Sequence, residues 1–169
     1  LLSPARLSPS IERQCIEVAE SLATALDLIG LLAVELFVSQ DGQVLINEIA
    51  PRPHNSGHHS IEANVTSQFE QHVRAVCDMP LGDTALKSPA VMVNLVGAEG
   101  YQGPVRYEGF NRVLAMPDVY IHLYGKAETR PFRKMGHVTI VRSDVNEAID
   151  IAQQIKEEIC YGGATNAPQ

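Results

Sequence analysis

Two apolar, β-prone runs, residues 31–38 and 44–49, are joined by a short polar segment that contains Asp41-Gly42. An Asp-Gly pair between two such runs is a strong local signal for a tight turn between antiparallel strands. The runs therefore predict a β-hairpin. The segment after the hairpin, residues 50–60, contains Pro51 and Pro53, so it cannot form a regular helix or a central strand.

An amphipathic helix is predicted before the hairpin. Ser8 is a suitable N-cap and Pro9 a suitable first helical residue. Apolar residues then recur every three or four positions to about Leu28, and Gly30 ends the pattern. We expect the apolar face of this helix to pack against the hairpin.

Farther along the chain, Pro, Gly, Asp and Ser cluster at residues 80–89 and predict a boundary between two patterned segments. A helix is expected before this boundary, over residues 67–77. After the boundary, strands are expected at residues 90–96, 119–124 and 136–141. A last helix begins at Asp144 and turns Ala148, Ile151, Ile155 and Ile159 inward. The prediction is an α+β chain, in which a helix and hairpin unit precedes a smaller unit of sheet and helix.

Glu35 and Glu48 lie within the two apolar runs of the hairpin. A two-residue turn at Asp41-Gly42 would pair Glu35 with Glu48 and bring their Cβ atoms to about 4.5–5.5 Å. Two like charges facing each other are destabilising, so the pair indicates a bound cation. Carboxylate oxygens favour Mg²⁺ or Mn²⁺. Two alternatives remain open, a solvated sheet face without metal and a three-residue turn that sets Glu35 against Asn47.

The segment after the second carboxylate concentrates hydrogen-bond donors and titratable groups, which are Arg52, His54, Asn55, Ser56, His58 and His59. Arginine can bind a carboxylate or phosphate through two parallel hydrogen bonds, and Asn and Ser add neutral donors. The segment therefore predicts an anion-binding loop. The alternatives are a solvated polar loop and a zinc site of the three histidines, although Pro53 and Gly57 argue against the helix that would align them.

A second group, Lys126, Arg130, Arg133 and Lys134, places four of the thirteen basic residues within nine positions. The whole chain has a formal charge of −7, so this segment is locally positive in a chain that is negative overall. Such a segment is typical of a site for one small anion, such as phosphate. The alternative is a solvated hairpin tip. The flanking His122 and His137 are expected to be ordinary strand residues.

Several classes of protein are excluded by composition. The negative charge argues against a general nucleic-acid binder or a protein that binds anionic membranes. No apolar run approaches the roughly 20 residues of a membrane helix, and the first residues lack the pattern of a signal peptide. Cys15, Cys77 and Cys160 have no disulfide or metal-site spacing, so we expect reduced, buried thiols in a cytoplasmic protein.

The hairpin and the loop after it resemble a known family. The run VELFVSQDGQVLINEIAPRPHNSGHHSIEANVTSQFEQHVRAV is similar to the distal half of the ATP-grasp domain of the 5-(carboxyamino)imidazole ribonucleotide synthase family, the ATPase subunit of phosphoribosylaminoimidazole carboxylase. The run HLYGKAETRPFRKMGHVTIV is similar to the C-terminal domain of that family. The motifs NEIAPRPHNSGH and GKAETRPFRKMGH are specific, whereas the paired glutamates are shared by all ATP-grasp enzymes.

The resemblance covers about residues 4–159 and implies an order of domains. It implies the C-terminal half of an ATP-grasp domain at residues 1–85, the family's C-terminal domain at residues 86–163 and a flexible tail at residues 164–169. The sequence contains no glycine-rich phosphate loop and no counterpart of the family's N-terminal nucleotide fold. Because the chain also starts at Leu1, without an initiator Met, we expect a C-terminal piece of a longer protein that is inactive alone.

The resemblance further implies an ATP-dependent ligase of purine biosynthesis that carboxylates aminoimidazole ribonucleotide with bicarbonate by way of carboxyphosphate. It implies ATP and Mg²⁺ as cofactors, with Mn²⁺ as a substitute, and a cytoplasmic homodimer as the full-length enzyme. The resemblance implies that Glu35 and Glu48 bind the metal and that Asn47 and Glu48 bind the nucleotide. It implies that Arg52, His54 and Asn55 orient bicarbonate and the imidazole. It also implies that Lys126 and Arg133 bind the ribonucleotide 5′-phosphate, with Arg130 and Lys134 as weaker candidates.

Two other functions fit parts of this pattern. One is a non-catalytic ligand-binding module that reuses half of an ATP-grasp fold. The other is a related purine-pathway ligase that uses formate or glycine. The PRPHNSGH and KMGH motifs favour the synthase, because within the family they serve the imidazole substrate and not ATP in general.

Overall fold

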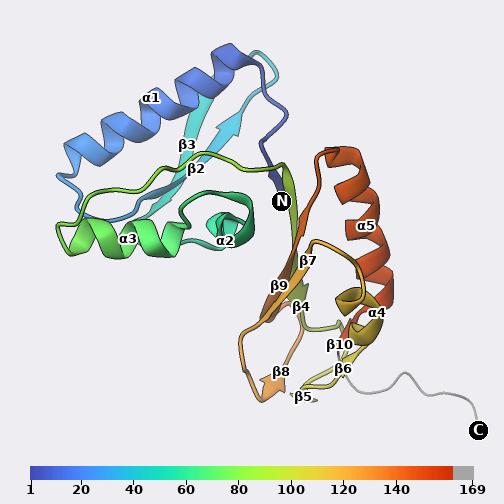
Figure 1. The fold of residues 1–169 in the computed structure, drawn as a ribbon. Helices are drawn as coiled ribbons and strands as arrows, with labels where there is room; N and C mark the ends of the chain where they lie inside the picture. Colours follow the sequence, from blue (N-terminus) through green and yellow to red (C-terminus); the bar gives the residue numbers. More distant parts are fainter. Residues whose placement is uncertain (162–169) are drawn as a thin grey trace, which may run out of the picture. The chain divides into compact units, whose positions relative to one another are not determined.

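The computed structural model describes residues 1–161 of the 169-residue chain, and the expected tail at residues 164–169 lies outside this range. The chain forms two compact units, which Figure 1 shows as a ribbon. One comprises residues 4–87, and the other comprises residues 1–3 together with the chain from residue 88 onward. Among the helices of the described range, none has the length and apolar character that crossing a bilayer requires.

The first helix of the 4–87 unit is α1, which spans Pro9–Ala25. Its N-cap is the expected one, since Ser8 Oγ accepts the N–H of Ile11 at 3.4 Å. The helix ends before the expected Leu28, because Asp27 adopts a left-handed backbone conformation with φ of 48°. The helical hydrogen-bond pattern cannot continue through such a residue.

The rest of this unit is the predicted hairpin and a set of short helices. Strands β2 (Ala33–Val38) and β3 (Val44–Ala50) pair antiparallel. They are followed by η1 (Asn55–Gly57), α2 (Ser60–Ala63) and α3 (Gln68–Val76). α3 confirms the helix expected at residues 67–77, with Ser67 as its N-cap and Cys77 as its C-cap. Cys77 is exposed and Cys15 is half-buried, so neither of these thiols is buried as expected.

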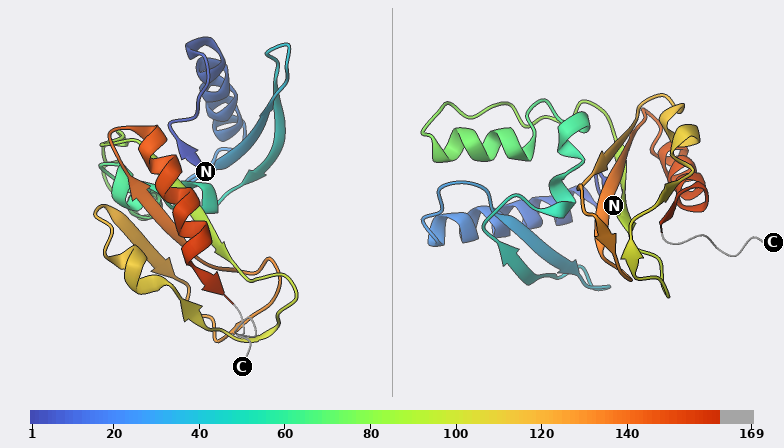
Figure 2. Two further views of the ribbon diagram at one scale, coloured as in Figure 1. Left: turned by 90° about the vertical axis from the view of Figure 1, so that its right-hand side faces the viewer. Right: turned by 90° about the horizontal axis from the view of Figure 1, so that it is seen from below.

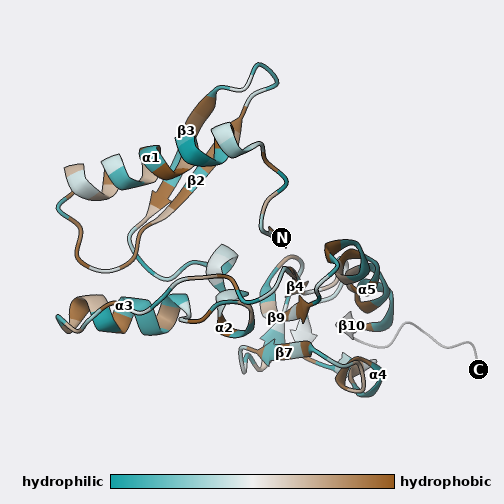
Figure 3. Ribbon diagram, turned by 45° about the horizontal axis from the view of Figure 1, so that its top comes forward, coloured by the Kyte–Doolittle hydropathy of each residue, from teal (hydrophilic) through white to brown (hydrophobic). Residues whose placement is uncertain are grey.

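Packing in this unit leaves much apolar surface exposed. Helix α1 contains no buried residue, and within residues 4–87 Ala63 is the one fully buried hydrophobic residue. Ile29, Phe37 and Ile46 are 77, 60 and 54% exposed. Apolar segments run along both hairpin strands in Figure 3. The expected packing of α1 on the hairpin therefore does not produce a buried core.

The other unit is built on a four-stranded antiparallel sheet of order β1-β4-β9-β7. Its strands are β1 (Leu2–Ser3), β4 (Ala90–Val96), β9 (Lys134–Val141) and β7 (Val119–Leu123). The last three confirm the predicted strands. Leu2 pairs with Val91, so residues 1–3 extend this sheet.

The core of this unit lies between one helix and the sheet. Helix α5 (Val145–Glu158) begins after its expected N-cap, Asp144, and lies across one face of the sheet (Figures 1 and 2). Its buried residues Ala148 and Ile155 pack with Val138 and Ile140 of the sheet, as the inward face of the predicted helix requires. The smaller elements are α4 (Phe110–Leu114) and two short pairs, β5 (Gly103–Pro104) with β8 (Glu128–Thr129) and β6 (Tyr107–Glu108) with β10 (Cys160–Tyr161).

Candidate functional site

The turn of the hairpin contains three residues, not the two that Asp41-Gly42 suggested. Ser39 donates its N–H to the carbonyl O of Gln43 at 2.9 Å, and Gly42 donates its N–H to the carbonyl O of Ser39 at 3.0 Å. Gly42 has a φ of 83°, as the last position of a three-residue turn requires. Such a turn shifts the pairing of the strands by one residue.

A β-bulge reverses this shift before the carboxylates are reached. Leu36 pairs with Ile46, but the next pair is Glu35 with Glu48, so Asn47 is the extra residue. The predicted pairing of Glu35 with Glu48 is thus confirmed, although by a different route from the one expected. A three-residue turn without the bulge would have set Glu35 against Asn47.

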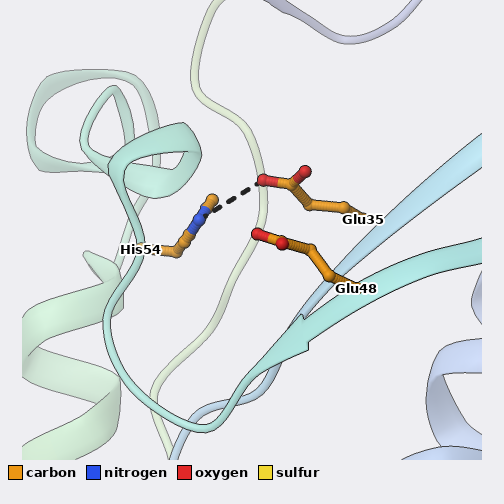
Figure 4. Close-up of side chains that lie close together, drawn as sticks. All are labelled: Glu35, Glu48 and His54. Atoms are coloured by element: carbon orange, nitrogen blue, oxygen red, sulfur yellow. Dashed lines mark ion pairs between the residues drawn. The ribbon is translucent and has the colours of Figure 1, made fainter.

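Three titratable side chains meet beside this bulge. Glu35 and Glu48 extend from neighbouring strands toward His54, which lies on the following loop (Figure 4). One ligand atom from each of the three lies within 4.8 Å of the other two. Nε2 of His54 is 3.4 Å from Oε1 of Glu35, and Nδ2 of Asn47 donates to Oε2 of the same carboxylate at 3.3 Å.

The tautomer of His54 follows from its other ring nitrogen. Nδ1 accepts the N–H of Ser56 and lies 2.8 Å from Ser56 Oγ. A nitrogen that accepts a hydrogen bond carries no proton, so the neutral imidazole carries its proton on Nε2. That proton faces Glu35, and a protonated nitrogen has no lone pair for a metal. In this tautomer the N–H nitrogen of His54 lies beside the carboxylate pair, 3.4 Å from Oε1 of Glu35.

The donor set fits a hard divalent cation. The two carboxylates offer oxygen atoms to one point, and Mg²⁺ usually takes one or two protein carboxylates and fills its other positions with water and phosphate oxygens. Both carboxylates remain accessible, since Glu35 is half-buried and Glu48 is exposed. Glu35 and Glu48 would therefore hold the metal, with His54 beside them.

The loop after the hairpin is held by a residue that the sequence did not indicate. Gln68, at the start of α3, forms hydrogen bonds with both the N–H and the carbonyl O of His54. Arg52 is exposed, and its Nη1 donates to the carbonyl O of Pro53 at 3.1 Å. Asn55 is half-buried, and its carbonyl O accepts the N–H of His58. The loop that carries Arg52, His54 and Asn55 is thus held to the start of α3 by Gln68.

The three histidines of this loop do not assemble a zinc site. Nδ1 of His58 accepts from the Gln68 amide, and the ring stacks on Phe69 at a centroid distance of 5.3 Å. Nδ1 of His59 donates to the carbonyl O of Ser56 at 2.9 Å. Burial lowers the pKa of His59, because a charged imidazole loses hydration there, while the bond to Ser56 acts in the opposite direction. Within residues 1–161, the group of Glu35, Glu48 and His54 is the one place where three side chains of a metal-ligand type meet.

The basic segment lies in the other unit, around the start of β9. Nζ of Lys126 donates to the carbonyl O of Lys134 and lies 5.7 Å from the ring centroid of Tyr124. Nη1 of Arg133 donates to the carbonyl O of Glu128 at 3.1 Å. These bonds use only part of the donor capacity of each cation, and both side chains are half-buried, whereas Arg130 is exposed.

The two histidines that flank this segment are strand residues, as expected. His122 on β7 pairs with His137 on β9, and their rings stack at a centroid distance of 4.5 Å. Nδ1 of the buried His137 lies 3.0 Å from the hydroxyl of Tyr124. The pair thus connects the sheet to the tyrosine over which Lys126 lies.

Comparison with known proteins gives two family matches, one in each part of the chain. Residues 1–69 match the ATP-grasp domain, and residues 90–151 match the phosphoribosylaminoimidazole carboxylase C-terminal domain. The N5-carboxyaminoimidazole ribonucleotide synthase of Bacillus subtilis is 45% identical over 146 residues, which are 86% of this chain and 37% of the relative.

Solved structures give the same result. The N5-carboxyaminoimidazole ribonucleotide synthetase of Thermotoga maritima is 48% identical and superposes with a TM-score of 0.91 over 96% of this chain and 45% of that one. The enzyme of Aspergillus clavatus, in complex with ADP and 5-aminoimidazole ribonucleotide, is 33% identical with a TM-score of 0.82 over 92% of this chain and 42% of that one. The chain spans less than half of the length of these relatives. It carries an ATP-grasp segment followed by a phosphoribosylaminoimidazole carboxylase C-terminal domain, and it is homologous to N5-carboxyaminoimidazole ribonucleotide synthases.

Proposed function

We propose that this chain is part of an ATP-dependent ligase that carboxylates 5-aminoimidazole ribonucleotide with bicarbonate in purine biosynthesis. The observation that carries the proposal is the group of Glu35, Glu48 and His54, where a hairpin with two facing carboxylates meets a loop rich in anion-binding groups. The homology to synthases, including one solved with ADP and 5-aminoimidazole ribonucleotide, supports the choice of substrates. The formate- and glycine-using ligases do not account for the match over residues 90–151.

The chemistry proceeds in two steps. An oxygen of bicarbonate attacks the γ-phosphorus of ATP, ADP leaves, and carboxyphosphate forms. The amine nitrogen of the ribonucleotide then attacks the carboxyl carbon, the C–O bond to phosphate breaks, and the amine loses a proton as inorganic phosphate leaves. Such phosphoryl transfer depends mainly on positioning and on stabilisation of charge. A bound Mg²⁺ would supply charge neutralisation at the phosphates, and Glu35 and Glu48 would hold it.

The residues of the loop and hairpin act on the bicarbonate and nucleotide. Arg52 offers two parallel donors to a carboxylate or phosphate, and Asn55 adds a neutral amide. His54 presents its Nε2 proton next to the carboxylate pair, where it can orient an oxygen of bicarbonate or of carboxyphosphate. Asn47, fixed by its bond to Glu35, would lie next to the nucleotide.

We assign the 5′-phosphate of the ribonucleotide to Lys126 and Arg133. In the longer enzyme, Lys126→Ala or Arg133→Ala should raise the KM for the ribonucleotide, because each removes a charge-assisted contact worth about 1.5–3 kcal/mol. The KM for ATP should stay nearly unchanged. Arg112→Ala serves as the control, since it removes an exposed cation of the same unit that pairs with Glu158.

The measurement is the rate of ADP release as each substrate is varied in turn. We expect release to require both bicarbonate and the ribonucleotide, which distinguishes the ligase from a binding module. A rise in the KM for ATP in the Lys126 and Arg133 variants would contradict the phosphate assignment. A rate of ADP release that does not depend on the ribonucleotide would contradict the proposed function.

A further inference from the structure

The buried side chain of Gln68 forms hydrogen bonds with the loop that carries His54. Its Oε1 accepts the N–H of His54 at 2.9 Å, and its Nε2 donates to the carbonyl O of His54 at 2.7 Å. The same Nε2 donates to Nδ1 of His58 at 2.9 Å. Both hydrogens of the amide and one lone pair of its oxygen are therefore used inside a residue that is only 8% exposed.

The surroundings of Gln68 are closely fitted to this arrangement. A Cβ atom at Gly57 would lie 2.5 Å from Gln68 Oε1, so a larger residue there would displace the amide from its present position. The main-chain N–H of Gln68 donates to Ser60 Oγ at 2.9 Å, and Ser60 Oγ donates to the carbonyl O of Gly57. The start of α3 and residues 54–60 are thus joined by a single hydrogen-bond network.

We propose that Gln68 is a positioning residue for the carboxylation reaction and acts through His54. Its two hydrogen bonds hold the amide and carbonyl of one residue, which fixes the orientation of that residue's backbone. The fixed backbone keeps the Nε2 proton of His54 opposite Glu35. This inference rests on the proposed function, because it assigns Gln68 a part in that reaction. A polar side chain that orients a reactive group contributes to rate because small misplacements are costly.

Helix α3 offers a matched control. Gln71 lies three residues after Gln68 and forms the same pair of bonds with another residue, since its Nε2 donates to the carbonyl O of Gly82 at 3.0 Å and its Oε1 accepts the N–H of Gly82 at 2.8 Å. Gln68→Met and Gln71→Met therefore remove the same kind of two-point contact from the same helix. Only the first contact is to the loop of His54.

In the longer enzyme, Gln68→Met should lower kcat by about tenfold to a hundredfold, the cost of misplacing a reacting group by about 1 Å. The KM for ATP should change little, and Gln71→Met should leave kcat close to that of the wild type. Gly57→Ala provides a second variant that keeps Gln68 but places a methyl group where its Oε1 lies. It should lower kcat in the same way as Gln68→Met.

A second readout uses this chain alone and does not depend on activity. The ¹⁵N shifts of His58, recorded well above the ordinary imidazole pKa of about 6.5, should show the proton on Nε2 in the wild type and in Gln71→Met. Gln68→Met should lose this preference because the donor to Nδ1 is gone. Equal losses of kcat in Gln68→Met and Gln71→Met, or a wild-type His58 protonated on Nδ1, would overturn the proposal. A wild-type enzyme without activity would contradict the proposed function instead, before any variant is compared.

Discussion

The carboxylates of Glu35 and Glu48 repel each other across the hairpin, so a divalent cation between them relieves a cost that the fold already carries. We predict that this chain binds Mn²⁺, a spectroscopic substitute for Mg²⁺, and that Glu48→Gln weakens the binding at least about tenfold by removing one anionic ligand. In the longer enzyme the same substitution should lower kcat.

The binding can be measured on the 169-residue chain from the paramagnetic resonance signal of free Mn²⁺. Glu20→Gln is the matched control, since it removes the same charge from an exposed position on α1 of the same unit. Equal weakening by Glu20→Gln and Glu48→Gln would mean that the ion responds only to net charge. The assignment of the pair as a metal site would then be wrong.

Phe132 is a strained residue in the basic segment. Its φ is 62°, in the left-handed region, and the residue is 74% exposed. A non-glycine residue in this conformation costs roughly 1–2 kcal/mol, which replacement by glycine would relieve. Part of this gain in stability is lost because glycine makes the unfolded chain more flexible. We predict that Phe132→Gly stabilises its unit relative to Phe132→Ala, which loses the same ring but keeps the strain.

The comparison is made by thermal unfolding of the two variants. A difference of about 1 kcal/mol corresponds to a shift in Tm of roughly 4–8 °C for a domain of this size. Equal midpoints for the glycine and alanine variants would contradict the predicted stabilisation by glycine.

Single residues also explain how far the site could be predicted. The residue types and the Asp41-Gly42 signal indicate a hairpin with two facing glutamates, and the structure has one. The path of the chain between them depends on a three-residue turn and on the bulge at Asn47. Neither has a strong local signal, because Asp-Gly occurs in both turn types and a bulge is set by the partner strand.

At the scale of elements, the two units differ in how much apolar surface they bury. Leu95, Val138 and Ile155 of the sheet unit are at most 1% exposed, whereas helix α1 contains no buried residue. Burial of apolar surface is the main source of stability. We therefore predict that amide hydrogens of β4 and β9 exchange at least about a hundredfold more slowly than those of α1 and the hairpin.

Hydrogen exchange of the whole chain, followed by NMR or mass spectrometry, tests this prediction without any variant. Equal protection in the two units would show that they unfold together. In that case the exposed apolar residues of α1 and the hairpin would not limit local stability, and the account of this unit would need revision.

Elements also show what local patterns cannot predict. Helices α3 and α5 and strands β4 and β7 follow their periodicity and caps closely, since the signals are local. The two hydrogen bonds between Gln68 and the main chain of His54 join positions 14 residues apart. Nothing in the sequence pattern around either residue indicates them. The pairing of Leu2 with Val91 is likewise a long-range contact, which the composition of the first residues does not show.

At the scale of the whole molecule, the chain spans 37% of the Bacillus subtilis relative. In the proposed function, the carboxylate pair, the loop of His54 and the basic segment would supply ligands for a metal, bicarbonate and phosphate. None of the described residues forms a glycine-rich loop that would hold the triphosphate of ATP. We therefore expect residues 1–169 alone to show no ribonucleotide-stimulated release of ADP, because the positioning on which phosphoryl transfer depends is incomplete.

The central claim is that the longer enzyme joins bicarbonate to the ribonucleotide by way of carboxyphosphate. It is tested most directly by supplying bicarbonate labelled with ¹⁸O and analysing the inorganic phosphate by mass spectrometry. Attack of a bicarbonate oxygen on the γ-phosphorus, followed by breakage of the C–O bond, predicts one ¹⁸O atom in each phosphate released. Phosphate free of the label, formed in the presence of both bicarbonate and the ribonucleotide, would contradict the claim.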